Sequence, residues 1–372
     1  MKIREMVMRE LRMPLVTPFE TSVEVTDIRR VVLIEARVEA AGGDVIGWGE
    51  CAAGEVPSYS PETTDTVWHI LKDYLWDLVK GEEIEAAADV WPMLEWVRGH
   101  NMAKAGLEAA IWDAQAKLEG VPLAKLLGGV REEIASGVSV GIKATLEELV
   151  KAVGKELADG YQRIKIKIEP GKDVEQVKRL RKEFPQVKLM VDANSAYRMR
   201  DLPLLKQLDA YHLMMIEQPL GWDDLYGHIR LQEQLATPIC LDECIHTEEQ
   251  AKAAVELGAC RIINIKMGRV GGHTVAKRIH DLCARHSVPV WCGGMLESGI
   301  GRAHNIALSS LANFVLPGDV AASKRYWHED IVEPEITVSK QGTIRVPTGP
   351  GIGFAPKLGL IEKLTVRKER LV

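Results

Sequence analysis

The stretch RIKIKIE, residues 163–169, alternates long cationic side chains with isoleucines. A β-strand with this period places the isoleucines on one face and the cations on the other. The simplest interpretation is an edge strand with one face in water. Similar segments recur downstream, however, with acidic residues in place of the lysines, and this recurrence indicates a repeating strand-helix fold.

Seven further short apolar segments lie between residues 137 and 320, and amphipathic helical patterns separate them. Eight β segments in regular β-α alternation indicate a parallel sheet, and eight is the number that closes a barrel of the triosephosphate isomerase type. The alternative is a doubly wound open sheet, which is disfavoured because no glycine-rich phosphate turn follows the first strand. The seven segments are GVSVGI (137–142), KLMVDAN (188–194), HLMMIEQP (212–219), PICLDE (238–243), RIINIKMG (261–268), VPVWCGGM (288–295) and FVLPGDV (314–320).

The regions outside this repeat have a mixed α+β character. VVLIEARVEA and DVIGWGECA flank Gly42 and Gly43 and predict a β-hairpin. AKAGLEAAIWDAQAKLEG (103–120) predicts a helix with one apolar stripe, and ITVSKQGTIRV (336–346) resembles a second hairpin. We therefore divide the chain into an N-terminal domain (1–130), the barrel (131–325) and a C-terminal segment that returns to the N-terminal domain (326–372).

The composition narrows the function classes. The chain has 372 residues, 46% of them hydrophobic, and a net charge of -6. The sequence lacks the clustered basic residues that nucleic-acid binding requires. No apolar stretch is long enough for a signal peptide or a membrane span. We expect a cytoplasmic protein that binds neither nucleic acid nor membrane and keeps its cysteines reduced.

One ionisable residue lies near the C-terminal end of each of five successive predicted strands. Lys167, Asp192, Glu217, Asp242 and Lys266 recur every 24 or 25 residues, so all five occupy the same height of a repeating strand-helix unit. Active sites of these barrels lie at that end of the strands. Alternation predicts that the five side chains point into the barrel, while neighbours such as Leu189 and Val191 face the helices.

Three carboxylates at one level repel one another unless a cation lies between them. Oxygen ligands favour a hard divalent ion, Mg²⁺ first and Mn²⁺ next. In an eight-stranded barrel the second and sixth strands are half a turn apart, so Lys167 and Lys266 face each other across the mouth. A metal-bound carboxylate substrate would have a lysine on each face of its α-carbon, which is an arrangement for removing the α-proton.

An ordered set of five motifs carries a resemblance to a known family. KIK (165–167), VDAN (191–194), IEQP (216–219), LDE (241–243) and NIK (264–266) resemble the enolase superfamily, specifically its muconate-lactonizing-enzyme-like subgroup, over nearly the whole chain. The resemblance implies a (β/α)7β TIM-like barrel with an α+β capping domain made from the N-terminal region and the C-terminal tail. It also implies Mg²⁺ bound by Asp192, Glu217 and Asp242 and an acid/base pair of Lys167 and Lys266, a pattern known for this superfamily.

Two motifs indicate a branch within the subgroup. KMGRVGG (266–272) and WCGGM (291–295) are similar to those of o-succinylbenzoate synthases that also racemise N-succinyl or other N-acyl amino acids. Arg269 stands where that branch has an arginine, and its charge would keep Lys266 partly neutral. Dipeptide epimerases have Asp-x-Asp where this chain has GDVA (318–321), and mandelate-racemase-like enzymes have a histidine where it has WCGG (291–294).

The resemblance and the strand pattern also predict residues that contact the substrate. Two capping loops, TPFETS (17–22) and GECAAGEVPSYS (49–60), should close over the barrel mouth. The expected contacts are Lys165, Ser139, Asn194 and Arg269 on the barrel, the backbone of Gly294 and Met295 for a distal carboxylate, and Phe19 and Tyr59 in the loops.

These observations predict metal-dependent removal of the proton α to the carboxylate of a small molecule. The reaction would be dehydration to o-succinylbenzoate in menaquinone biosynthesis, racemisation of N-acylamino acids, or both, in a homo-oligomer. The alternatives are a dipeptide epimerase or cycloisomerase, a Schiff-base aldolase that uses a strand-end lysine, and a barrel that has lost its catalytic activity.

Overall fold

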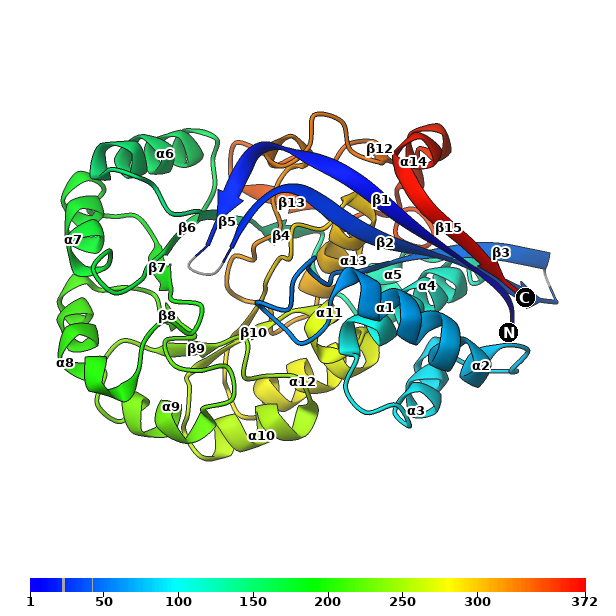
Figure 1. The fold of residues 1–372 in the computed structure, drawn as a ribbon, viewed down its shortest axis with the longest axis horizontal. Helices are drawn as coiled ribbons and strands as arrows, with labels where there is room; N and C mark the ends of the chain where they lie inside the picture. Colours follow the sequence, from blue (N-terminus) through cyan, green and yellow to red (C-terminus); the bar gives the residue numbers. More distant parts are fainter. Residues whose placement is uncertain (22–23, 42) are drawn as a thin grey trace.

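The computed structural model describes residues 1–21, 24–41 and 43–372, so Gly42 of the predicted turn and Ser22 of the first predicted loop lie outside the described residues. A curved parallel sheet surrounded by helices forms one half of the molecule, and an antiparallel sheet with its own helices forms the other (Figure 1). The first half carries the strand ends that the sequence singled out.

The barrel sheet has seven parallel strands whose spatial order is also their order along the chain. This arrangement confirms the predicted α/β barrel fold and excludes the doubly wound sheet, in which the strand order reverses. The strands are β5 (Gly137–Val140), β6 (Arg163–Lys167), β7 (Leu189–Asp192), β8 (Ile216–Glu217), β9 (Ile239–Leu241), β10 (Ile262–Ile265) and β11 (Val290–Cys292).

The predicted eighth strand, residues 314–320, is not a regular strand. Its backbone nevertheless contacts both edges of the sheet: Asp319 N donates to Cys292 O (2.8 Å), and Gly137 N donates to Gly318 O (2.7 Å). The proline before Gly318 has no N–H to donate, which interrupts a regular ladder. An irregular extended segment therefore closes the barrel between β11 and β5.

The two faces of the strands bury different residues. Met190, Met215, Cys240, Ile262 and Trp291 form a separate apolar cluster inside the barrel, and the first three lie two residues before Asp192, Glu217 and Asp242. Their sequence neighbours, such as Leu189 and Val191, belong to the main core under the helices. The predicted alternation is confirmed, and the ionisable residues continue the inner face above an apolar layer.

Helices connect successive barrel strands and cover the outer face (Figure 1). Several begin with a side-chain cap, as at Thr145, whose hydroxyl accepts from Glu148 N. The connecting helices are α6 (Leu146–Ala158), α7 (Val174–Glu183), α8 (Leu202–Leu205), α9 (Leu225–Gln232), α10 (Glu248–Glu256), α11 (Met267–Val270), α12 (His273–Arg285) and α13 (Gly299–Ser309).

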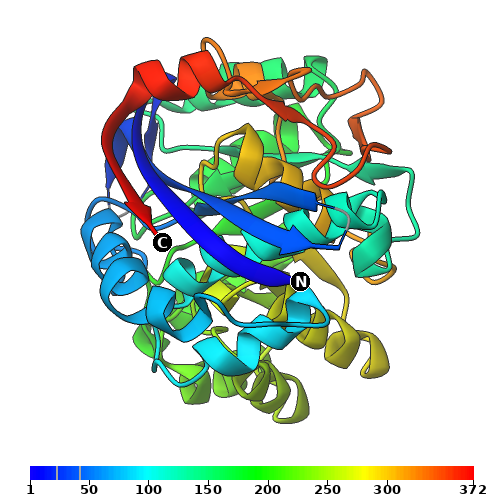
Figure 2. The same cartoon turned by 90° about the vertical axis from the view of Figure 1, so that its right-hand side faces the viewer.

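The second half is built on a four-stranded antiparallel sheet of order β15-β1-β2-β3. The predicted hairpin is confirmed, because β2 (Val25–Ala40) pairs with β3 (Gly43–Cys51). The C-terminal strand β15 (Thr365–Leu371) pairs with β1 (Lys2–Glu20), which brings the two chain ends together (Figure 2). This sheet and the helices α1 (Thr64–Ile70), α2 (Trp76–Val79), α3 (Val90–Leu94), α4 (Asn101–Leu118) and α5 (Leu123–Leu127) form the capping domain.

Two predictions for this half need correction. Helix α4 is buried on nearly every side, not along one apolar stripe. The expected hairpin of residues 336–346 does not form as a pair of strands: β13 (Thr343–Arg345) pairs instead with β4 (Glu133–Ala135). The remaining elements are β12 (Val332–Glu333), β14 (Ala355–Pro356) and α14 (Leu358–Leu364). In the described chain, every helix is too short or too polar to cross a membrane.

Candidate active site

The five residues of the periodic pattern lie together at the C-terminal ends of the barrel strands. Lys167, Asp192 and Glu217 are the last residues of β6, β7 and β8, and the sheet register pairs Lys167 with Asp192 and Asp192 with Glu217. Asp242 and Lys266 are the first residues after β9 and β10. All five side chains are buried.

Lysines pair with all three acids. Lys167 Nζ lies 2.6 Å from Asp192 Oδ2, and Lys266 Nζ lies 2.8 Å from Asp242 Oδ2. Lys165 Nζ lies 2.9 Å from Glu217 Oε2 and 3.1 Å from Asp192 Oδ2. Each carboxylate that the sequence proposes as a metal ligand is thus already paired with a cation of the chain.

Asp192, Glu217 and Asp242 supply carboxylate oxygens, which are the ligands that a hard divalent cation prefers. Burial, and next the negative charge of Asp192, raise the pKa of Glu217, and the same two causes raise the pKa of Glu243 to about 7. Such mutual repulsion is what a divalent ion relieves. Across the described ranges no three His, Cys, Asp or Glu side chains are gathered around one point, so holding an ion requires the carboxylates to exchange their lysine contacts for it.

The electrostatics of Lys266 differ from the expectation based on Arg269. Burial lowers the pKa of Lys266, but Tyr59, Glu217 and Glu243 outweigh burial, and the pKa lies above its ordinary value. The Arg269 guanidinium is bound to Asp242, and its Nε donates to Ile245 O (2.6 Å). Repulsion from Arg269 therefore does not make Lys266 neutral in this arrangement.

A cavity of about 450 Å³ lies over this layer, between the strand ends and the two capping loops. This volume is in the usual range for a small-molecule site. Its barrel wall includes Lys167, Asn194, Ser195, Ala196, Trp222, Glu243, Lys266, Gly294, Met295 and Leu296, and its capping wall includes Phe19, Thr21, Glu24–Arg29, Gly54–Val56 and Ser58–Ser60.

Seven of the predicted catalytic and substrate-contact residues line the cavity: Lys167, Lys266, Asn194, Gly294, Met295, Phe19 and Tyr59. Both predicted catalytic lysines are among them, and β7, β8 and β9 separate their strands in the sheet. The tip of the β1–β2 hairpin is attached to the barrel, because Ile142 N donates to Glu20 O (3.1 Å). This contact holds the first capping loop beside the barrel mouth.

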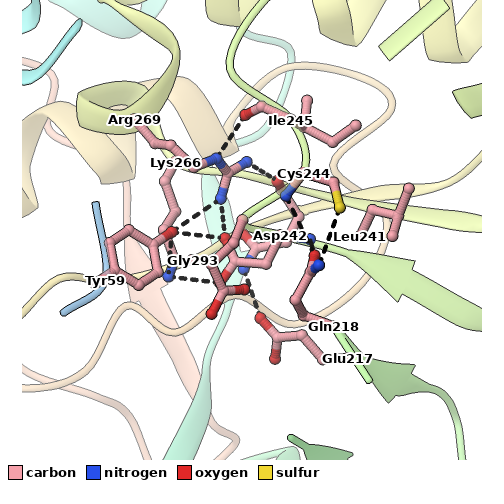
Figure 3. Close-up of polar contacts among 12 residues, drawn as sticks. Tyr59, Glu217, Gln218, Leu241, Asp242, Cys244, Ile245, Lys266, Arg269 and Gly293 are labelled. Carbon is pink, nitrogen blue, oxygen red and sulfur yellow. Dashed lines mark hydrogen bonds and ion pairs between the residues drawn. The ribbon is translucent and has the colours of Figure 1, made fainter. Parts of the chain in front are cut away.

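The structure does not bring Lys165, Ser139 and Arg269 to the cavity wall. Lys165 lies lower, where it also pairs with Asp319 Oδ2 (2.7 Å). Ser139 is its register neighbour on β5, with its Oγ buried and without a partner in the described chain. The Arg269 guanidinium donates to Asp242 Oδ1 (Figure 3). Lys165 and Arg269 thus make polar contacts within the protein, Ser139 Oγ makes none in the described chain, and the substrate contacts of all three stay predictions.

Three residues that build the site were missed by sequence reasoning. Asn264 Nδ2 donates to Glu217 Oε1 (2.8 Å). Gln218 Oε1 accepts from Asp242 N (3.0 Å) (Figure 3). Asp319 Oδ1 pairs with Arg163 Nη1 (2.7 Å). Strand alternation carried a signal for Asn264, which lies two residues before Lys266 on the inner face, and Asp319 is the acid of the closing segment.

Both walls of the cavity include further residues that the local sequence pattern could not indicate. Arg29 is buried, and its guanidinium donates to Ala52 O and Ala53 O (both 2.7 Å), which ties β2 to the second capping loop. Ile28 and Trp222 remain exposed beside the opening. These residues come from segments far apart in sequence, so only the fold places them together.

Three of the seven non-glycine residues with positive φ in the described chain lie at the cavity. Asn194, Ser195 and Leu296 line it, and each has a positive φ (40°, 65° and 56°) although none is glycine. Non-glycine residues rarely adopt this conformation, and they cluster at functional sites where the surroundings hold them in place. The segments after β7 and β11 therefore hold, beside the cavity, a backbone conformation that is uncommon for non-glycine residues.

The geometry agrees with comparisons to known proteins. An o-succinylbenzoate synthase from Geobacillus kaustophilus is 51% identical over 98% of this chain and 96% of its own length. An N-succinylamino acid racemase from an Amycolatopsis species is 47% identical over 99% of both chains. A crystal structure of an enolase superfamily member from Listeria innocua superimposes with a TM-score of 0.96, at 42% identity over 100% of this chain and 99% of the other.

The family assignment covers both halves of the molecule. Residues 3–128 match the family "Mandelate racemase / muconate lactonizing enzyme, N-terminal domain", and residues 148–359 match "Enolase C-terminal domain-like". The barrel with its ionisable strand ends and the capping sheet above it identify this chain as a member of the enolase superfamily.

Proposed function

We propose that this protein removes the α-proton of a carboxylate substrate with the help of a divalent metal ion, as an o-succinylbenzoate synthase, an N-succinylamino acid racemase, or both. The observation that carries this proposal is the pair of lysines, Lys167 and Lys266, on one cavity above three buried carboxylates. The two relatives above bear these names. The alternatives of dipeptide epimerase, cycloisomerase and Schiff-base aldolase are not favoured by these relatives.

Members of the superfamily bind a divalent metal ion, typically Mg²⁺. In this chain Asp192, Glu217 and Asp242 would hold it, and Mg²⁺ is the first candidate with Mn²⁺ next. When bound, the ion supplies electrostatic stabilisation of the negative charge that develops on the substrate carboxylate as the α-proton leaves. The exchange of ion pairs that this requires would also free Lys167 and Lys266 from Asp192 and Asp242.

The two lysines would divide the proton transfers by the face of the substrate. In racemisation, one lysine takes the α-proton from one face and the other returns a proton to the opposite face, with roles set by the enantiomer. In dehydration, Lys167 takes the α-proton, a hydroxyl group leaves to complete the loss of one water, and Lys266 remains as a cation beside the ring.

The remaining cavity residues would orient the substrate. The backbone at Gly294 and Met295 would receive the distal carboxylate, Asn194 would hydrogen-bond near the reacting group, and Phe19 would supply apolar contact. Lys165, held by Asp192, Glu217 and Asp319, would act as a fixed positive charge below the site. Small-molecule carboxylates are therefore the substrate class that we propose.

Incubation with each enantiomer of an N-succinyl amino acid in deuterium oxide tests the racemase activity, and formation of o-succinylbenzoate from its cyclohexadiene precursor tests the synthase. We expect activity with Mg²⁺, its loss with a chelator, and its return when Mg²⁺ is restored. Lys167→Ala should lower the rate of the synthase reaction by at least about 1000-fold, since it removes the base. Lys151→Ala, an exposed lysine on α6, is the matched control.

The proposal fails if neither reaction occurs. Absence of α-proton exchange with both enantiomers excludes the racemase, and absence of o-succinylbenzoate excludes the synthase. Activity that resists the chelator but yields a borohydride-trapped lysine adduct would support the aldolase instead.

A further inference from the structure

We propose that Tyr59, from the capping domain, is the positioning residue of Lys266, whereas the barrel alone positions Lys167. The inference rests on the proposed function, in which each lysine serves one face of the substrate. It predicts that the loop after β3 affects one half of a racemisation and not the other.

The ammonium group of Lys266 has two contacts with Tyr59. Lys266 Nζ donates to Tyr59 Oη (3.1 Å) and lies 4.3 Å from the centre of its ring (Figure 3). Its other hydrogen-bond partner within the described residues is Asp242 Oδ2 (2.8 Å). A hydroxyl oxygen and an aromatic face both attract an ammonium ion, so the tyrosine restricts both the distance and the direction of the lysine tip.

The hydroxyl of Tyr59 is itself oriented by its surroundings. Lys266 and Arg269 can only donate hydrogen bonds, and Arg269 Nη1 lies 3.2 Å from Tyr59 Oη. The oxygen must therefore accept from both, and its single proton is directed to Asp242 Oδ1 at 2.8 Å. Because Arg269 is also fixed by its bond to Ile245 O, Tyr59 lies in a network with one consistent pattern of donors and acceptors.

The other lysine has no such contact with the capping domain among the described residues. Lys167 Nζ donates to Asp192 Oδ2 and to Asn194 Oδ1, both at 2.6 Å. Asn194 is in turn held by Glu243, to which its Nδ2 donates (3.0 Å). All of these partners belong to barrel strands or to the loops that follow them, so the two lysines differ in what fixes them.

The difference becomes larger if Asp242 serves as a metal ligand. Lys266 would then lose this carboxylate as a partner, and Tyr59 would continue to hold its ammonium group. Lys167 would likewise lose Asp192, but it would keep Asn194. Removal of the Tyr59 hydroxyl should therefore misplace Lys266 alone, and a misplacement of about 1 Å is enough to slow a proton transfer substantially.

The test measures exchange of the α-proton for deuterium separately from each enantiomer of an N-succinyl amino acid, with Mg²⁺ present. Lys167→Ala and Lys266→Ala first assign each enantiomer to its base. We expect Tyr59→Phe, which keeps the ring, to slow exchange from the substrate enantiomer that Lys266 deprotonates by at least about tenfold, and Tyr59→Leu to slow it further. Exchange from the substrate enantiomer that Lys167 deprotonates should stay within about twofold of wild type.

Equal losses for the two enantiomers, or no loss for either, would overturn the proposal, because a general effect on substrate binding or folding is symmetrical. A second measurement needs no substrate: acetic anhydride labelling followed by peptide mass spectrometry. Labelling of Lys266 relative to Lys167 should rise in Tyr59→Leu, and an unchanged ratio also overturns the proposal. If wild type shows no exchange but the labelling ratio shifts, the racemase part of the proposed function fails and the positioning role stands.

Discussion

Lys266 reaches the cavity through a space that one glycine leaves open. A Cβ at Gly293, just after β11, would lie 2.6 Å from Lys266 Cε and 2.4 Å from Asn264 Oδ1. These distances are shorter than real Cβ contacts, so any side chain there must displace one of the two residues. The backbone conformation of Gly293 is open to any residue, so the close approach of Lys266 is what requires glycine at this position.

At this residue scale we predict that Gly293→Ala lowers the rate of α-proton exchange by roughly 10- to 100-fold, because Lys266 is displaced from the substrate. Deuterium incorporation measures the rate, and circular dichroism checks that the fold is kept. Gly154→Ala on α6 is the control, because its Cβ would meet only a Phe184 ring atom, at 3.6 Å. Exchange at the wild-type rate in a folded Gly293→Ala protein would contradict the prediction.

Side-chain alternation along the strands predicted the face on which the polar residues lie, but not their height in the barrel. Alternation placed the ionisable strand ends on the inner face, and the apolar cluster below them confirms that face. It did not separate Lys165 from Lys167, which share the face but differ in height. Three carboxylates hold Lys165 below the cavity, and these partners come from three other segments of the chain.

At the element scale, the contact between β3 and α4 explains why the predicted apolar stripe was incomplete. A Cβ at Gly49 would lie 2.0 Å from Gly106 O and 2.8 Å from Ala110 N. Glycines on both elements thus allow a strand backbone to rest directly on a helix backbone. The helix face that carries small residues is buried as completely as the face that carries large ones.

We predict that Gly49→Ala destabilises the protein by about 3 kcal/mol, because overpacking at a rigid backbone contact cannot be relieved by a side-chain rotation. Urea denaturation measures the free energy of unfolding. Gly359→Ala on α14 is the control, because its Cβ would have no atom within 4 Å. A loss of less than about 1 kcal/mol would show that β3 and α4 can separate at little cost.

At the scale of the whole molecule, carboxylates of the capping domain bind the N-terminal ends of barrel helices. Glu108 of α4 accepts from His273 N (2.6 Å) and Thr274 N (2.9 Å) at the start of α12. Glu50 of β3 accepts from Ser298 N (3.1 Å) and Gly301 N (3.0 Å) at the start of α13. Free N–H groups and the helix dipole favour an acceptor there, so these contacts hold the capping domain over the barrel.

Glu50 should make the stability of this interface depend on pH. Burial raises the pKa of Glu50 from an ordinary value of 4.5 to about 7. A raised pKa means that the folded protein holds this proton more tightly than the unfolded chain, so the contribution of Glu50 is complete below pH 4.5 and is lost as pH rises toward 7. The affected window is therefore pH 4.5 to 7.

We predict that Glu50→Gln removes this part of the pH dependence, because glutamine stays uncharged across the window. The melting temperature of wild type relative to Glu50→Gln should fall as pH rises from 4.5 to 7. Differential scanning calorimetry at several pH values measures it, with Glu147→Gln, an exposed glutamate on α6, as control. Parallel curves for wild type and Glu50→Gln would contradict the prediction.

The barrel is predictable from the amino-acid pattern, because the alternation of apolar strands and amphipathic helices is local and repeats. The pattern also indicates which strand ends carry lysines and acids, since a side-chain period of two fixes the face and a regular spacing fixes the height. The closing segment was less predictable, because its pairing depends on two edges that are distant in sequence.

Which of these residues meet, and which of them reach the cavity, depends on the three-dimensional packing of the chain. Tyr59, Arg29 and Asp319 act through contacts with residues far away along the chain. Neighbours from distant segments also change the chemistry of the site: Tyr59, Glu217 and Glu243 raise the pKa of Lys266 although burial lowers it. Ion pairing and desolvation depend on distances in space, and no local period of the sequence contains those distances.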